Sequence, residues 1–265
     1  MINLPAVDSK KLKLLLIIGF VVQLTAWFLE GWFYGTSYSR FLLFQGFQDD
    51  QGIFIERIFL CMAFSSLIGL LPSKNRKWSW FLFIYPILEI INILLMILDS
   101  QKPGVELSLI AGMGRLGFPL ALWFLKRSHF SLTKFIERLL GLFIGLTFVG
   151  HGLKALLQEP EYQDYLYFLF SLMPKDYLPS FELIPQILNS IGLIDILAGV
   201  IIFLRPDNKK LLLYLCLWGF LTALLRPLYS GNDGWLPFFL RVPHWLIPLS
   251  LLIWSHNYNK RGTVT

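Results

Sequence analysis

Apolar stretches of about twenty residues recur along nearly the whole chain, separated by short polar segments. A helix of that length crosses the roughly 30 Å hydrocarbon core of a bilayer. The chain is 55% hydrophobic and 15% charged, whereas soluble domains carry about 25% charged residues. Because lipid satisfies no backbone polar group, each span must be a helix. The sequence therefore predicts an all-α, polytopic transmembrane helical bundle.

Eight such spans are predicted. The first follows a basic flank, but its apolar core is longer than that of a signal peptide and no small-residue cleavage site follows, so we expect it to be retained. The predicted spans cover residues 12–33, 53–72, 79–98, 106–125, 137–157, 186–204, 210–229 and 236–255.

The formal net charge of +6 is distributed unevenly between the two sides of the predicted bundle. Basic residues concentrate in the N-terminal flank, in the tail and in the connections after spans two, four and six, whereas most acids lie in the other connections. By the positive-inside rule, this predicts an inner-membrane protein with both termini in the cytoplasm. No exposed basic segment is interleaved with aromatic residues, which excludes nucleic acid as an expected partner. The charged residues that support this orientation include Lys74, Lys102, Lys175, Asp176, Lys260 and Arg261.

Two connections on the predicted outer side are long, acidic and rich in aromatic residues: 34–52 and 158–185. The segment "YLYFLFSLM" is apolar but too short to span a membrane. We expect its rings to lie at headgroup depth or to cap the bundle. These loops are also the predicted contact surface for an extracytoplasmic protein partner.

Spans one and five place polar residues at the same spacings of four and seven, which puts them on one helix face. This pattern, together with similar ends of spans two and six and of spans four and eight, predicts two parallel four-helix modules, 1–128 and 129–265. The matched residues are Gln23, Trp27 and Glu30 in span one, and Thr147, His151 and Lys154 in span five.

The second module contains "ERLLGLFIGLTFVGHGLKAL", "LNSIGLIDILAGVIIFLRP" and "LWGFLTALLRPLY". With an early Arg138, a glycine-rich helix that ends in His151 and Gly152, and Asp195 inside "GLIDILAG", it resembles the DoxX-like family of small four-helix membrane proteins. The resemblance covers about 120 residues. The first module departs from it: it lacks the His-Gly pair and carries its acid, Glu89, on the third span.

The resemblance implies a four-helix membrane fold more firmly than it implies a function, because the family is functionally mixed. Its members are similar to membrane subunits of quinone-linked sulfur oxidoreductases, to accessory proteins of periplasmic enzymes, and to cargo or assembly factors. A quinone is the cofactor that the first of these roles implies.

Ionisable side chains inside the spans are the candidate ligand-binding residues. A central Arg or Asp costs roughly 2.5–3.5 kcal/mol to insert, so these groups must be paired or hydrated by a cavity. We expect them to gather between mid-membrane and the outer surface, where the excess of arginine favours an anionic or hydrogen-bond-accepting guest. The candidates are Glu89, Arg115, His151, Asp195, Arg226, Arg241 and His244.

Individual candidates have more than one interpretation. His151 makes a structural hydrogen bond, contacts a ligand, or ligates metal or haem with His244. Asp195 is expected to pair with an arginine, and this pair is either purely structural or lines a binding pocket. Lys154 extends to the interface. Gly141 and Gly145 form a G-x-x-x-G motif, which is typical of close helix packing.

No catalytic motif is present. There is no H-E-x-x-H, C-x-x-C, phosphate loop or dinucleotide fingerprint, which disfavours haem or a metal as cofactor. Cys61 and Cys216 lie in apolar runs and are interpreted as small hydrophobes.

Three functions compete at this stage. The first is a membrane subunit of a redox system that binds a quinone, lipid or similar amphiphile in an outer-half polar cavity. The second is a non-catalytic accessory or assembly factor for an extracytoplasmic partner. The third is a small-anion transporter.

Overall fold

The computed structural model describes residues 6–72, 76–100, 104–127, 134–174 and 182–259, and these contain helices and turns but no strand. Lys74, Lys102, Lys175, Asp176, Lys260 and Arg261, used above for orientation, lie outside the described residues. The predicted all-α helical bundle is confirmed. The elements are α1 (Ala6–Tyr34), α2 (Ser37–Phe44), α3 (Asp49–Phe64), η1 (Ser65–Leu70), η2 (Arg76–Phe83), α4 (Ile84–Asp99), η3 (Val105–Leu107), α5 (Ser108–Ala111), α6 (Met113–Arg127), α7 (Lys134–Leu156), α8 (Pro160–Ser171), α9 (Leu183–Leu204), α10 (Lys209–Ser230), η5 (Gly231–Gly234), α11 (Trp235–Leu240) and α12 (Val242–Asn259).

Seven stretches of the described chain, rather than the eight predicted, are long and apolar enough to cross a membrane. The first seven predicted spans correspond to them. The eighth, 236–255, is divided at Arg241 into α11 and α12, and the apolar part of α12 is shorter, Val242–Ser255. Pro243 explains the break, because it has no amide hydrogen to donate to the carbonyl of Phe239 in a continuous helix. The long stretches are Lys11–Phe44, Asp49–Leu70, Lys77–Asp99, Val105–Arg127, Lys134–Leu156, Leu183–Leu204 and Lys209–Leu240.

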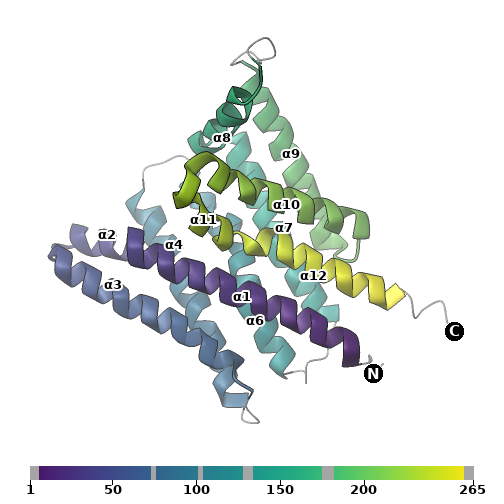
Figure 1. The fold of residues 1–265 in the computed structure, drawn as a ribbon, viewed down its shortest axis with the longest axis horizontal. Coiled ribbons are helices and arrows are strands. Elements are labelled where there is room, and N and C mark those ends of the chain that lie inside the picture. The colour runs from purple at the N-terminus through teal and green to yellow at the C-terminus, as the bar shows by residue number, and fades with distance from the viewer. Residues whose placement is uncertain (1–5, 73–75, 101–103, 128–133, 175–181, 260–265) are drawn as a thin grey trace.

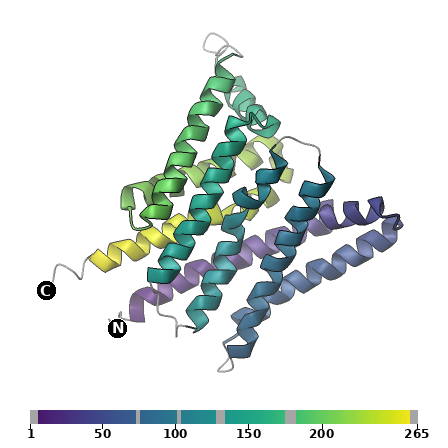
Figure 2. The same ribbon diagram turned by 180° about the vertical axis from the view of Figure 1, so that it is seen from behind.

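The long helices form two layers that cross each other (Figures 1 and 2). In one layer α3, α1, α12 and α10 lie in that order. In the other the order is α4, α6, α7 and α9. Contacts between α1 and α6, between α12 and both α6 and α7, and at the two edges hold the layers together. The two chain ends emerge at the same side of the molecule (Figure 1).

The packing of the two halves corresponds helix by helix. Contacts of α1 with α3, α6 and α12 match those of α7 with α9, α12 and α6. The short α2 packs on α3 and α4, as α8 packs on α9 and α10, and the broken α5–α6 pair corresponds to α11–α12. Exchanging the halves therefore maps one layer onto the other. On this basis we propose the division into modules 1–128 and 129–265.

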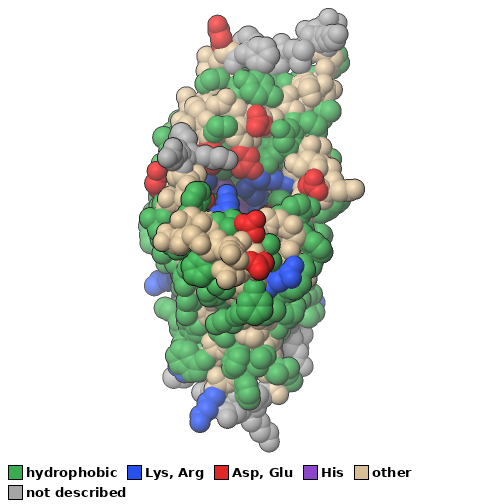
Figure 3. Space-filling model, turned by 90° about the vertical axis from the view of Figure 1, so that its left-hand side faces the viewer, with side chains coloured by type: hydrophobic (Ala, Val, Ile, Leu, Met, Phe, Trp, Pro, Cys, Tyr) green, Lys and Arg blue, Asp and Glu red, His purple; other side chains and the backbone are tan. Residues whose placement is uncertain are grey.

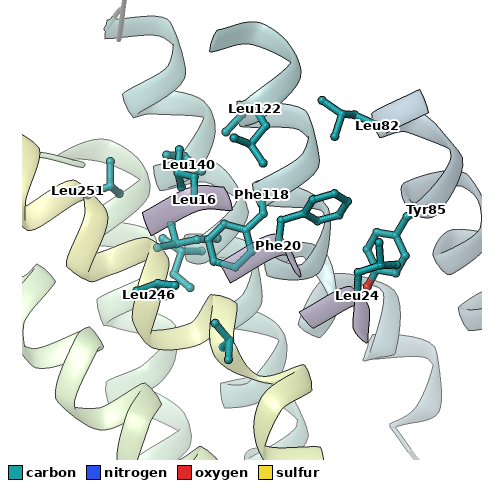
Figure 4. Close-up of a cluster of buried hydrophobic side chains, with 14 of the residues drawn as sticks. Leu16, Phe20, Leu24, Leu82, Tyr85, Phe118, Leu122, Leu140, Leu246 and Leu251 are labelled. Atoms are coloured by element: carbon teal, nitrogen blue, oxygen red, sulfur yellow. The ribbon is translucent and has the colours of Figure 1, made fainter. Parts of the chain in front are cut away.

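The apolar core lies where the two layers cross (Figure 4). Phe20 of α1 and Phe118 of α6 are fully buried there beside Leu246 of α12. Gly19 permits this crossing, because an added Cβ would lie 2.5 Å from the Phe118 ring and 2.7 Å from Leu246. The centre of the molecule is thus packed with hydrocarbon, and the polar site lies away from it.

Helices α7 and α9 pack backbone to backbone. A Cβ on Gly145 would lie 2.7 Å from the Gly199 carbonyl oxygen, and one on Gly152 would lie 2.6 Å from that of Gly192. Gly141 contacts α9 and the residue Pro206 that follows it. The close packing predicted from the G-x-x-x-G motif is confirmed, and it continues along α7 to the residue beside His151.

Candidate functional site

A cavity of about 390 Å³ lies between α7, α8, α9, α10 and the start of α12. Its wall is mostly apolar, formed by leucine, isoleucine and aromatic side chains, and polar groups occupy limited parts of it. On the side of the molecule that carries α2 and α11, the surface is hollowed, with basic side chains inside the hollow and acidic ones around it (Figure 3). Five of the seven predicted site residues line the cavity: His151, Asp195, Arg226, Arg241 and His244.

The break between α11 and α12 positions two of these residues. Arg241 leaves the helical conformation, with φ −92° and ψ 8°, and its carbonyl accepts a hydrogen bond from the amide of His244 at 3.0 Å. This tight turn places the side chains of Arg241 and His244 in the cavity wall, together with His151 of α7. The proline that shortens the predicted eighth span therefore also shapes the site.

Two histidines meet across the cavity. The Nε2 atoms of His151 and His244 are 2.9 Å apart. The Nδ1 atom of His151 lies 2.6 Å from the Tyr162 hydroxyl, and Nδ1 of His244 lies 3.0 Å from the Arg241 carbonyl oxygen. His151 thus forms hydrogen bonds to two neighbouring helices, as its structural interpretation predicts. It also lines the cavity.

Arg226 of α10 binds Glu161 of α8 in an ion pair, and its guanidinium lies 4.8 Å from the centre of the Tyr165 ring. Tyr165 also donates a hydrogen bond to Glu161 at 2.9 Å. Burial by itself raises the pKa of Glu161, but the nearby Arg226 and Arg241 outweigh it, so the pKa lies below its ordinary value. This pair joins α8 to α10 and leaves Arg226 electrically balanced.

Arg241 differs from Arg226 in its surroundings. Its guanidinium has no hydrogen-bond or ion-pair partner among the residues that the structure describes, although it lines the cavity and interacts electrostatically with Glu161 and Arg226. Glu161 forms its ion pair with Arg226, and Glu30 of α1 interacts with both arginines electrostatically. The Arg241 end of the cavity therefore keeps unused, fork-shaped donors on a positive charge, which suit an anionic or acceptor-rich group.

Asp195 of α9 lies in another part of the cavity wall. It is only 6% exposed, the Trp218 indole is its hydrogen-bond partner, and its Oδ1 atom has none within the described part of the chain. The pair with an arginine that the sequence analysis considered for Asp195 is not formed, because Arg226 is bound to Glu161 instead. Asp195 therefore provides a buried acceptor atom that a donor group on a ligand could satisfy.

Glu89 and Arg115 do not line this cavity. They form an ion pair in the first half, in which Glu89 is fully buried and the Arg115 side chain is 27% exposed, with 2.5 Å between Arg115 Nη1 and Glu89 Oε1. Trp27 Nε1 donates to Glu89 at 2.6 Å, and Gln23 Nε2 to the Tyr85 hydroxyl at 2.6 Å. The expectation of one convergent set of seven residues is therefore corrected to two clusters.

The two clusters are electrostatic neighbours. Glu30 of α1 interacts with Arg115 of the first cluster and with Arg226 and Arg241 of the second. Lys154, which the sequence analysis places at the interface by its length, is paired with Glu159 at 3.1 Å. Glu30 therefore contributes negative charge between the clusters.

Sequence reasoning did not identify four residues of the site, three of which carry a carboxylate or a hydroxyl group. Glu161 and Tyr162 stand on α8, whose aromatic residues were interpreted as membrane anchors. Their only local signal was their place four residues or less after Pro160, which begins α8 as a first-turn proline typically does. Tyr162, Tyr165 and Trp218 line the cavity, and Glu161 binds the cavity residue Arg226.

Metal ligation lacks the usual donors. The described residues contain no cluster of three His, Cys, Asp or Glu side chains able to hold an ion. His151 and His244 already use their facing nitrogens on each other, and both cysteines are free. The residues present fit a group held by hydrogen bonds and apolar contact better than a metal.

Comparison of the chain with protein-family models, with curated proteins and with solved structures gives no match. Function must therefore be argued from the site itself.

Proposed function

We propose that the protein binds an amphiphilic small molecule in the cavity between α7, α8, α9 and α10. The observation that carries the proposal is the Arg241 guanidinium, without a partner among the described residues, at one end of a cavity whose wall is otherwise mostly apolar. An apolar wall with a few fixed polar groups is the usual form of a small-molecule site. Arg241 would hold an anionic or acceptor-rich headgroup, and the leucines would surround the hydrocarbon part.

A quinone is the ligand class that we favour, in the role of a membrane subunit of a redox system. The cavity offers donors at the Arg241 end and the free Asp195 Oδ1 acceptor elsewhere, so it suits a flat ring that carries polar groups at more than one edge. The resemblance of the second half to the DoxX-like family supports the same role. A lipid with an anionic headgroup shares part of this chemistry.

The test is direct identification of a bound molecule. The protein is purified in a mild detergent, organic extracts are analysed by mass spectrometry, and the amount of quinone or lipid per protein is compared with that of variants. We expect a retained amphiphile in the wild type and at least a tenfold loss in Arg241→Gln, because one charge-assisted contact contributes about 1.5–3 kcal/mol.

Arg57→Gln is the matched control. Arg57 lies on α3, against the ring of Trp32, and does not line the cavity. Its replacement should leave ligand retention unchanged. Equal retention by Arg241→Gln and wild type, or no amphiphile in any preparation or reconstitution, would count against the proposal.

We further propose that the protein lies in the inner membrane with both termini in the cytoplasm, which places the Arg241 end of the cavity toward the outside. The shared side of the two chain ends supports this, together with the charge distribution of the sequence. An extracytoplasmic partner would then meet the segments 34–52 and 158–185. Site-specific photo-crosslinking from Phe44, which is 75% exposed, tests for that partner in intact cells.

A further inference from the structure

The hydrogen-bond chain at the histidine pair has only one direction when both imidazoles are neutral. The Arg241 carbonyl can only accept, so His244 must carry its proton on Nδ1. His244 Nε2 is then an acceptor, and His151 must donate from Nε2. His151 Nδ1 is left as an acceptor, so the Tyr162 hydroxyl must donate to it. One backbone carbonyl thereby fixes three side-chain protons.

In this neutral arrangement the Tyr162 oxygen faces its surroundings only as an acceptor, because its proton is used on His151. Adding one proton to the pair reverses the chain. His244 then donates from Nε2 to His151, and His151 donates from Nδ1 to the Tyr162 oxygen. The Tyr162 proton is released from His151 and becomes available to a group in the cavity, which Tyr162 also lines.

We propose that the His151–His244 pair takes up a proton when an anionic headgroup binds beside Arg241, so that ligand charge and proton uptake are coupled at this site. The inference rests on the proposed function and deepens it: the pair makes the site selective for anions that bind together with a proton. Neutral hydroxyl headgroups need no such uptake, because they can both donate and accept.

The charges around the pair explain why the two events are linked. Lys154 on α7, Arg226 on α10 and Arg241 after α11 place positive charge near His151, and Arg115 of α6 adds to it near His244. Three carboxylates oppose these cations. Glu161 of α8 pairs with Arg226, and Glu159, which precedes α8, pairs with Lys154. Glu30 of α1 interacts electrostatically with Arg226 and Arg241. Arg241 is the cation that acts most strongly on both histidines, so an anion bound to it reduces the repulsion that opposes a positive charge on the pair.

The experiment uses the full-length protein in nanodiscs of zwitterionic phosphatidylcholine. The probe is a long-chain alkyl sulfonate, whose charge does not change between pH 5.5 and 8, and the control ligand is an alkyl alcohol of equal length. Binding is measured by titration calorimetry in two buffers of different ionisation enthalpy, which gives the number of protons taken up.

We expect the sulfonate to bind with uptake of up to about one proton and an affinity that rises by up to about tenfold for each pH unit lowered. The alcohol should bind with no proton uptake. The variant His151→Gln/His244→Gln should lose the proton uptake, whereas His129→Gln/His256→Gln, which replaces the other two histidines of the chain, should retain it.

Sulfonate binding without proton uptake overturns this inference and leaves the proposed function standing. Proton uptake that persists in His151→Gln/His244→Gln also overturns it, since another group must then titrate. Failure of both ligands to bind the wild type overturns the proposed function and this inference together.

Discussion

At the scale of single residues, the two clusters of charged side chains inside the bundle differ in how their charges are balanced. Glu89 and Arg115 are bound to each other, and Trp27 donates to Glu89, so the two charges of that cluster neutralise each other and we call it closed. Arg241 has donors to spare, and Asp195 has an acceptor to spare. Because a cavity borders Arg241 and Asp195 but not Glu89 or Arg115, the second cluster is the one that a ligand would complete.

Breaking the closed cluster should destabilise the protein strongly. Glu89→Gln leaves the Arg115 charge buried without its counter-ion, and we expect unfolding in mixed micelles to require about 3–5 kcal/mol less. Glu89→Gln/Arg115→Gln should recover part of the loss. The exposed Arg40, 3.8 Å from Asp99, is the control, and Arg40→Gln should change stability by less than about 1 kcal/mol. Additive losses in the double variant would contradict this coupling.

The Glu161–Arg226 pair predicts a pH dependence with a definite sign. Because the folded protein lowers the pKa of Glu161, the pair stabilises the fold above the ordinary carboxyl pKa, and this is lost as pH falls through the lowered value. Glu161→Gln should therefore lower Tm at pH 7, and the difference from wild type should shrink toward pH 3.5. Glu161 is 45% exposed, so the effect should stay below about 1 kcal/mol. A difference that grows on acidification would refute it.

At the scale of elements, helix breaks and glycine contacts place the functional groups. Arg115 and His244 each stand three residues after a break, at Gly112 and Arg241, with matching amide-to-carbonyl hydrogen bonds of 2.9 and 3.0 Å. The same local turn thus presents an arginine to the closed cluster and a histidine to the cavity. Each half carries a proline four residues later, Pro119 and Pro248.

The α7–α9 contact gives the prediction at this scale. In Gly152→Ala the new Cβ would stand 2.6 Å from the Gly192 carbonyl oxygen, which forces the two helices apart and moves His151 with them. We expect a loss of about 1–3 kcal/mol in unfolding and weaker amphiphile retention. Gly52→Ala on α3, whose new Cβ would lie 3.7 Å from the nearest atom, should leave retention unchanged and should not lower stability, because alanine favours the helix over glycine. A Gly152→Ala protein as stable as wild type would contradict the backbone-to-backbone contact.

At the scale of the whole molecule, the proposed topology with both termini in the cytoplasm requires an even number of crossings, so it makes α12 the eighth crossing beside the seven long stretches. α12 lies beside α1 and α10 although its described apolar part is short, and the two termini share one side. The turn between α10 and α11 and the turn between α9 and α10 should therefore face opposite sides of the membrane.

Labelling with a membrane-impermeant maleimide tests this topology in intact cells. In a chain with Cys61→Ala and Cys216→Ala, we expect Asn232→Cys to react from outside and Asn208→Cys to react only after the membrane is opened. Asn232 lies in η5 and Asn208 caps the start of α10. Labelling of both positions from the same side would refute the arrangement.

The helical membrane fold, seven of the spans and the close packing at Gly141 and Gly145 follow from the sequence, because they depend on local hydropathy and residue size. The sequence also indicated the ionisable residues of the spans that line the cavity, but not Trp218. The separate cluster of Glu89 and Arg115, the pairing of Arg226 with Glu161 rather than Asp195, and the contact of Tyr162 with His151 emerge from the three-dimensional packing alone. These pairings depend on how the helix ends lie relative to one another and on the break at Arg241 and Pro243. Average hydropathy contains no information about either.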